Sequence, residues 1–191
     1  WKNLKRICKP KTTYIFFASL RFSVDLINSN PNFFRHDLIY VKTNSVGFLQ
    51  CKHLPLRSHE IILIFQNKNT GTKTYNPQMK IGKPYIHKGS TDSNKEPIYD
   101  NHTTRTPYSN TSGARYPTSV LTGFKHDKEK LHPCQKPVSL CEWLLNSYSN
   151  EGDVVLDFCM GSGSSIVACL NLNRCYIGIE KDPVCFAKAA N

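Results

Sequence analysis

The segment VVLDFCMGSGSSIVACLNLNRCYIGIE, residues 154–180, decides the fold. Apolar runs at 154–158 and 175–180 predict two strands, and the glycine turn between them leads into a helix. Two parallel strands joined through a helix form a right-handed βαβ unit. Gly161 and Gly163 permit a tight turn and the close approach of a ligand, because they carry no Cβ. We therefore expect an α/β fold with a ligand site at this turn.

Two acidic residues end the two strands of this unit. Asp157 precedes the glycines, and Glu180 follows 23 residues later. This is near the spacing of ~20 residues at which a carboxylate meets a ribose hydroxyl in nucleotide-binding folds. A dinucleotide fingerprint, GxGxxG, would need a third glycine where Ile166 stands, and this side chain is expected to obstruct close helix–strand packing. The turn alone is therefore weak evidence for a cofactor.

The rest of the chain supplies further strands and helices around this unit. β-Branched and aromatic runs indicate strands, and apolar residues at helical spacing indicate helices. Strands are predicted at 12–18, 37–42 and 60–66, and helices at 20–30, 137–149 and 182–191. This mixture predicts a doubly wound, Rossmann-like sheet.

Residues 67–130 have a different composition, dominated by Asn, Thr, Ser, Gly, Lys, Pro and Tyr. The stretch is too long for an ordinary loop, and it is either disordered or a recognition insertion held by its partners. Charge is also uneven along the chain. Residues 1–130 hold 21 Lys and Arg against 8 Asp and Glu, whereas residues 131–191 hold 4 against 6. A basic face for phosphates explains this division, and general solubility is the alternative.

Composition also excludes several classes of protein. No apolar run approaches the ~20 residues that cross a bilayer, and the N-terminal residues lack the apolar core of a signal peptide. The eight cysteines include no CxxC pair, and several lie inside apolar runs. We expect reduced thiols, no metal site and no membrane partner, in a cytoplasmic protein.

The segment HPCQKP at 132–137 makes the interpretation specific. This segment, the helix after it and DFCMGSGSS at 157–165 resemble the S-adenosylmethionine half of the adenine-N6/cytosine-N4 DNA methyltransferases of the β motif order. That family has HPTQKP and DPFMGSGTT, so Phe158 and Cys159 replace its Pro-Phe pair. The runs ICKPKTTYIFFAS, VKTN, HEIILIF and RYPTSVLTGF also have counterparts there, and the resemblance covers nearly the whole chain.

The resemblance implies S-adenosylmethionine as the cofactor. By this resemblance, the glycine turn binds the methionine part of the cofactor, and the end of the second strand binds its ribose. Residues 135–137, here called the QKP segment, close over the cofactor from the other side. For Gln135 and Lys136 a solvated helix cap is the alternative, since Pro137 suits the first turn of a helix. The cofactor-binding residues it implies are Asp157, Phe158, Cys159, Gly161, Ser162, Gly163, Glu180, Gln135, Lys136 and Pro137.

The function implied is transfer of a methyl group to an exocyclic amino group of double-stranded DNA, with adenine N6 favoured over cytosine N4. A non-catalytic DNA- or cofactor-binding remnant, for instance from a phage or mobile element, is the alternative. A cognate restriction endonuclease and a second copy of the chain are further expected partners. Basic and amide side chains suit phosphate contacts and base reading. The expected DNA-binding residues are Lys42, Asn44, Lys52, Arg57, Arg105 and Arg115.

The family's circularly permuted motif order divides the chain into three parts. These are a reaction half at 1–70, a target-recognition region at 71–130 and a cofactor half at 131–191. The family's catalytic motif, (D/S/N)PP(Y/F), does not occur in the 191 residues. We therefore assign no catalytic residue and expect an N-terminal segment with this motif to be missing. Its strand would lie between the strands at 12–18 and 154–158, and the chain alone is expected to be inactive.

Overall fold

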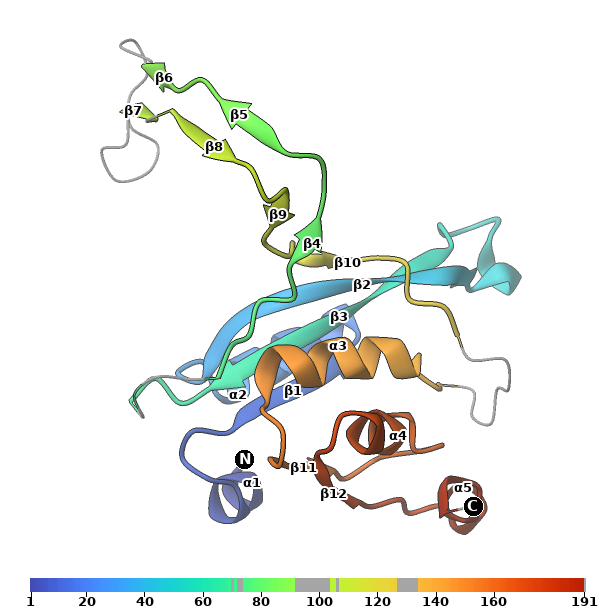
Figure 1. Ribbon diagram of the computed structural model, residues 1–191. Helices are drawn as coiled ribbons and strands as arrows, with labels where there is room; N and C mark the ends of the chain where they lie inside the picture. Colours follow the sequence, from blue (N-terminus) through green and yellow to red (C-terminus); the bar gives the residue numbers. More distant parts are fainter. Residues whose placement is uncertain (70, 72–73, 92–103, 106, 127–133, 191) are drawn as a thin grey trace. The chain divides into compact units, whose positions relative to one another are not determined.

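The computed structural model describes residues 1–69, 71, 74–91, 104–105, 107–126 and 134–190 (Figure 1). The chain divides into two compact units. The first unit combines residues 1–76 with residues 118–191, and the second consists of residues 77–117. The first two residues of the HPCQKP segment lie outside the described residues, as does the middle of the predicted target-recognition region.

The first unit contains a four-stranded sheet in the order β1-β3-β2-β10 (Figure 1). Its strands are β1 (Thr13–Ala18), β2 (Phe34–Val46), β3 (Arg57–Gln66) and β10 (Val120–Leu121). Strand β3 runs antiparallel to both β1 and β2, whereas β10 is parallel to β2. The three long strands match the predicted ones, although β1 begins one residue later than predicted, and β2 and β3 begin three residues earlier.

Alternate residues of β3 build the two cores of this sheet. Ile62 and Ile64 face one side, and Leu63 and Phe65 face the other, as the period of a strand requires. All four are at most 1% exposed. The second face is covered by aromatic residues near Trp1 and by helices α1 (Lys2–Ile7) and α2 (Leu20–Ser29). These two helices and the aromatic residues therefore cover this face of the sheet.

The predicted βαβ unit is present at the C-terminal end of the described chain. Strand β11 (Val154–Asp157) leads through α4 (Ser164–Asn171) to β12 (Cys175–Gly178), and the two strands are parallel. Helix α5 (Pro183–Ala190) follows. Among the described residues, no ladder of hydrogen bonds joins this pair of strands to the four-stranded sheet.

Helix α3 (Val138–Tyr148) packs against both parts of the first unit (Figure 1). One apolar stripe lies in the core of the four-stranded sheet, and a second stripe contacts α4. The first stripe consists of Leu140, Leu144 and Tyr148, and the second of Cys141 and Leu145 with Ala168 and Cys169 of α4. Two apolar stripes at helical spacing explain why this short helix is largely buried.

The C-terminal end of α3 is held by two side chains from distant parts of the sequence. The Asn76 amide donates to the carbonyl oxygens of Asn146, at 3.1 Å, and Ser149, at 3.2 Å. The Arg174 guanidinium donates to the Ser149 carbonyl at 3.2 Å and to the Leu172 carbonyl at the end of α4. A cation at helix C-termini satisfies free carbonyls and opposes the helix dipole.

The second unit is a ladder of short antiparallel strands. Its pairs are β4 (Lys80–Ile81) with β9 (Ala114–Arg115), β5 (Tyr85–His87) with β8 (Tyr108–Asn110), and β6 (Ser90–Thr91) with β7 (Thr104–Arg105). The hydroxyls of Tyr85 and Tyr108 lie 2.7 Å apart, and His87 stacks on Tyr108. The low aliphatic content of this stretch is therefore compatible with ordered strands, because polar and aromatic contacts hold them.

Replacing Leu140 by alanine is expected to lower the free energy of unfolding by roughly 2–5 kcal/mol, because it leaves a cavity between α3 and the sheet. Leu140 is fully buried, whereas Leu170 on α4 is 59% exposed. The matched change Leu170→Ala should cost less than about 0.5 kcal/mol. Urea denaturation followed by circular dichroism measures both, and equal effects would contradict this packing.

Candidate functional site

The carboxylate of Asp157 organises the turn that follows β11. One of its oxygens accepts a hydrogen bond from the Cys159 amide at 3.1 Å, and the other accepts from the Ser165 hydroxyl at 2.5 Å. The turn is thus tied to the first residues of α4. Phe158 lies between these contacts with its side chain 48% exposed. Asp157 fixes the turn, and its neighbour presents an aromatic ring to solvent.

Glu180 closes the other side of the same turn. Its carboxylate accepts from the Asp182 amide at 3.0 Å and from the Gly161 amide at 2.8 Å. These two backbone donors, led by that of Asp182, lower the pKa of Glu180. A carboxylate has lone pairs beyond these two hydrogen bonds, so it can still accept from a ligand hydroxyl.

Gly163 has a positive φ of 80°, and a Cβ there would lie 3.2 Å from Cβ of Ala189. This conformation and this close contact both favour glycine. The pairing of β11 with β12 thus brings the predicted cofactor residues of the turn, 157–163, beside Glu180, whereas Gln135, Lys136 and Pro137 lie directly before α3. Their assignment to a cofactor remains a prediction.

The expected obstruction by Ile166 is wrong. Ile166 is buried at 7% exposure and packs toward Gly178 of β12. A Cβ added at Gly178 would lie 3.2 Å from Cδ1 of Ile166 and would collide with Sδ of Met160. The glycine that permits close helix–strand packing is therefore on the strand and not on the helix.

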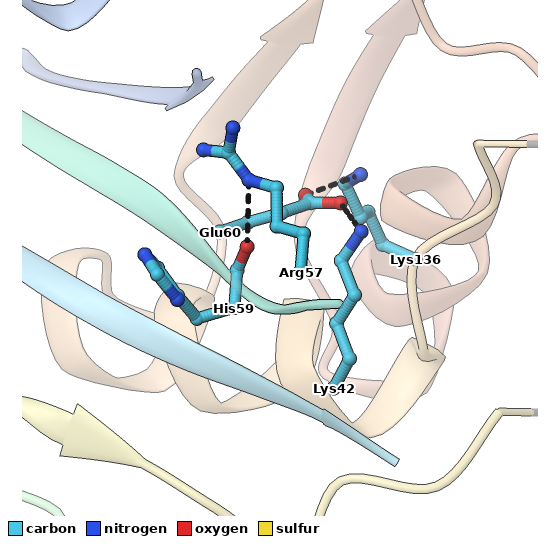
Figure 2. Close-up of polar contacts among 5 residues, drawn as sticks. All are labelled: Lys42, Arg57, His59, Glu60 and Lys136. Atoms are coloured by element: carbon cyan, nitrogen blue, oxygen red, sulfur yellow. Dashed lines mark hydrogen bonds and ion pairs between the residues drawn. The ribbon is translucent and has the colours of Figure 1, made fainter. Parts of the chain in front are cut away.

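A second group of charged residues centres on Glu60 of β3 (Figure 2). Its two carboxylate oxygens form ion pairs with Lys42 of β2 and Lys136, each at 2.7 Å. Lys136 belongs to the QKP segment directly before α3, and its ammonium also lies 5.1 Å from the centre of the Phe17 ring. These contacts attach the QKP segment to the four-stranded sheet.

The electrostatics of Glu60 favour its charged form. Burial by itself raises the pKa of this carboxyl group, but hydrogen bonds and charges from Lys136 and Lys42 outweigh burial and leave the pKa lowered. The three side chains are 16–22% exposed, so solvent screens the pairs less than at an open surface. Glu60 is therefore a stable anionic anchor for two lysines.

These residues border a cavity of about 290 Å³. It lies where β1 ends and α2 begins, and its walls also include the start of β3. The lining residues are Phe17, Ala18, Ser19, Lys42, Arg57, Glu60 and Lys136. Lys42 and Lys136 pair with Glu60, whereas Arg57 donates to the His59 carbonyl at 3.3 Å, so the lining has an excess of positive charge (Figure 2). Its size is near the lower end for small-ligand pockets.

Sequence reasoning did not include Glu60 or Phe17 among the site residues. An acidic residue at the head of a buried strand was the available signal for Glu60, but its partners come from β2 and from the segment before α3. Pro137 is buried at the N-cap of α3. A helix-capping role and a cofactor-closing role are therefore both compatible with the QKP segment.

The expected DNA-binding residues fall into the two units. Lys42 and Arg57 line the cavity, while Asn44 and Lys52 are exposed on β2 and on the connection to β3. Arg105 belongs to β7 and Arg115 to β9. The Arg115 guanidinium stacks on Tyr85 at 4.8 Å and donates to the carbonyls of Gly113 and Lys83. DNA binding by any of these residues remains a prediction.

Within the described part of the chain, no three His, Cys, Asp or Glu side chains are grouped so that they could hold a metal ion. The described helices are all too short or too polar to cross a bilayer.

The chain matches the family model N6_N4_Mtase, described as DNA methylase, over residues 1–191, and it belongs to this family. The type II methyltransferase M.HpaI of Haemophilus parainfluenzae is 51% identical over 57 residues, which are 30% of this chain and 18% of that relative. The curated relatives compared are matched over only 15–28% of their own length.

Two solved structures share the fold. The complex of M1.HpyAVI with SAM has a TM-score of 0.63 at 22% identity, covering 97% of this chain and 76% of that one. The cytosine-N4-specific PvuII DNA methyltransferase has a TM-score of 0.61 at 14% identity, covering 95% and 64%. The fold is therefore that of amino-methyltransferases, as the sequence predicted.

Replacing Glu60 by glutamine is expected to lower the free energy of unfolding at pH 7 by roughly 1–3 kcal/mol, because two charge-assisted hydrogen bonds are lost. The lowered pKa of Glu60 makes its contribution complete above its ordinary pKa of 4.5, and lost as the pH falls through the folded-state value. The difference in the free energy of unfolding between wild type and Glu60→Gln should thus become smaller below pH 4.5.

Chemical denaturation at several pH values measures this difference. Glu142→Gln on α3 is the matched control, because the Glu142 carboxylate accepts a hydrogen bond from the neutral Asn171 amide at 2.7 Å. A difference for Glu60→Gln that stays constant from pH 7 to below pH 4.5 would contradict the ion pairs.

Proposed function

We propose that the C-terminal half of this chain binds S-adenosylmethionine, which supplies an activated methyl group. The single observation that carries the proposal is the turn between β11 and α4, where the Asp157 carboxylate accepts from the Cys159 amide and the Glu180 carboxylate accepts from the Gly161 amide. Glu180 would also accept from a ribose hydroxyl, and the absence of a side chain at Gly161 would leave room for the methionine part of the cofactor. Gly163 would permit the tight turn, with α5 packed against it. The exposed ring of Phe158 would cover an adjoining surface.

The QKP segment would close the cofactor site from the other side. Lys136 is held to the sheet by Glu60 and Phe17, so the position of this segment is defined before a ligand arrives. Pre-ordering of this kind reduces the entropy that a ligand must remove on binding. Gln135 and Lys136 are the polar side chains that this proposal places at the cofactor.

We further propose that the parent enzyme methylates an exocyclic amino group in double-stranded DNA, with adenine N6 as the favoured target. Cytosine N4 is the second candidate, and the PvuII neighbour with that specificity supports keeping it. Family membership supports the DNA substrate, and nucleoside analysis of the product would distinguish the two bases. The ladder at residues 77–117 lies within the region proposed for target recognition. This role is proposed because its arginines and tyrosines suit contacts with phosphates and bases.

Transfer to an amino group requires more than the residues that this chain provides. The nitrogen lone pair is delocalised into the base, and the family's (D/S/N)PP(Y/F) loop would accept the amino protons and stack on the flipped base. This motif is not present in the 191 residues. We therefore propose that this chain alone binds cofactor and DNA without catalysing transfer. A cytoplasmic location, a cognate endonuclease and a homodimer also remain proposals.

Replacing Gly161 by valine is expected to weaken S-adenosylmethionine binding by at least about tenfold, equivalent to ~1.4 kcal/mol. Gly161 has a positive φ of 54° and its amide donates to Glu180, so an added β-branched side chain would strain this part of the turn and crowd a ligand there. Gly152→Val is the matched control, because Gly152 also has a positive φ, of 78°, but lies in the turn before β11. Isothermal titration calorimetry on folded variants measures the affinities, and equal affinity for Gly161→Val and wild type would overturn the cofactor assignment.

The 191-residue chain is expected to transfer no methyl group to mixed-sequence DNA by itself. A chain extended at its N-terminus by a family segment with the (D/S/N)PP(Y/F) strand should transfer it, because the loop would then stand beside the cofactor turn. Incorporation of radiolabelled methyl groups measures both chains. Robust transfer by the short chain would show that the catalytic group lies among residues already present.

A further inference from the structure

The connection between β2 and β3 presents apolar side chains to solvent. Phe48 is 76% exposed and Leu49 is fully exposed, and both lie on a short 3-10 helix at Phe48–Gln50. Leu54, in the same connection, is 58% exposed. Neighbouring apolar residues with this degree of exposure mark surfaces that interact with a partner. We call residues 47–56 the hairpin tip.

The hairpin tip is held by its own backbone. Gly47 adopts a positive φ of 96° and starts the turn. The Gln50 amide donates to the Gly47 carbonyl at 2.9 Å, and the amide of Leu54 donates to the Gln50 carbonyl at 2.9 Å. The apolar side chains are therefore displayed on an ordered turn, so that binding a partner would cost little conformational entropy.

The segment that forms the tip and the flanking strands carries only positive charge. Residues 38–59 include Lys42, Lys52 and Arg57 but no Asp or Glu. The next acidic residue, Glu60, is already paired with Lys42 and Lys136. The hairpin tip is apolar, and the ends of β2 and β3 that carry it, here called the stem, are basic. Duplex DNA complements this combination, because it has a polyanionic backbone and stacked apolar bases.

We propose that the hairpin tip inserts Phe48 and Leu49 between stacked base pairs of duplex DNA, while Lys52 and Arg57 contact the flanking phosphates. Apolar wedges of this kind unstack a base step and bend the duplex. The inference rests on the proposed binding of DNA, and it adds which segment distorts the duplex. A base that must leave the stack for methylation is more easily released where its neighbours are already unstacked.

The stem connects the hairpin tip with the cationic cavity. Val46 pairs with Arg57 where the hairpin begins, and Arg57 also lines the cavity with Lys42 and Glu60 (Figure 2). Positive charge therefore continues from the tip to the cavity along two paired strands. This continuity favours a long polyanion over a lipid surface, which would contact the tip alone.

The test uses duplexes that contain 2-aminopurine, whose fluorescence rises when it is unstacked. Wild-type protein is expected to raise the fluorescence, and Phe48→Ala/Leu49→Ala should abolish the rise and weaken DNA binding by about tenfold. The salt dependence of DNA affinity should be the same for this variant as for wild type. Lys52→Ala should instead keep the fluorescence rise and reduce the salt slope by about one.

The control variant Phe186→Ala/Leu170→Ala removes the same two side-chain types from α5 and α4, where they are 47% and 59% exposed. It should match wild type in both measurements. Circular dichroism checks that every variant is folded.

Each of the following outcomes would overturn the inference. If wild-type protein does not bind DNA in fluorescence anisotropy, the proposed DNA function fails together with the wedge. If it binds without a fluorescence rise, or if the tip variant keeps the rise, only the wedge fails. If the tip variant changes a dimer into a monomer in ultracentrifugation and leaves the rise intact, the tip is a subunit interface. Loss of binding to phosphatidylserine vesicles alone would make the tip a lipid contact.

Discussion

The packing of α3 on two sides is the interaction on which the first unit depends. Leu140 and Leu144 enter the core of the four-stranded sheet, while Cys141 and Leu145 contact α4 of the βαβ unit. No hydrogen-bonded ladder among the described residues connects the two sheets, so apolar burial along this helix provides the connection. Asn76 and Arg174 hold its C-terminal end by donating to carbonyl oxygens.

Helix α3 sets the position of both parts of the proposed cofactor site. The QKP segment directly precedes α3 and is anchored to the sheet through the Lys136–Glu60 ion pair. The glycine turn directly precedes α4, which α3 contacts. A shift of α3 would therefore move the two sides of the proposed cofactor site relative to each other. The helix lies in two apolar clusters and supports the turn that is proposed to bind the cofactor.

The sequence was sufficient where structure depends on residues close together in the chain. The strand, glycine turn, helix and second strand at 154–180 were predicted correctly, because a βαβ unit is a local structure. The cofactor roles of Asp157 and Glu180 stay predictions. The sequence was insufficient where partners are distant. The space for Ile166 comes from Gly178 on the neighbouring strand, and the partners of Glu60 come from positions 42 and 136. The ladder at 77–117 was not predicted because its strands are two or three residues long, too short for a periodic pattern.

The central claim is that the glycine turn and the QKP segment hold one cofactor together. Hydrogen exchange followed by mass spectrometry, with and without S-adenosylmethionine, tests it most directly. The account predicts slower exchange of backbone amides at 159–163 and at 134–136 in the same titration, with a common dependence on ligand concentration. Slower exchange at only one of these segments, or at neither while the ligand is bound, would contradict it.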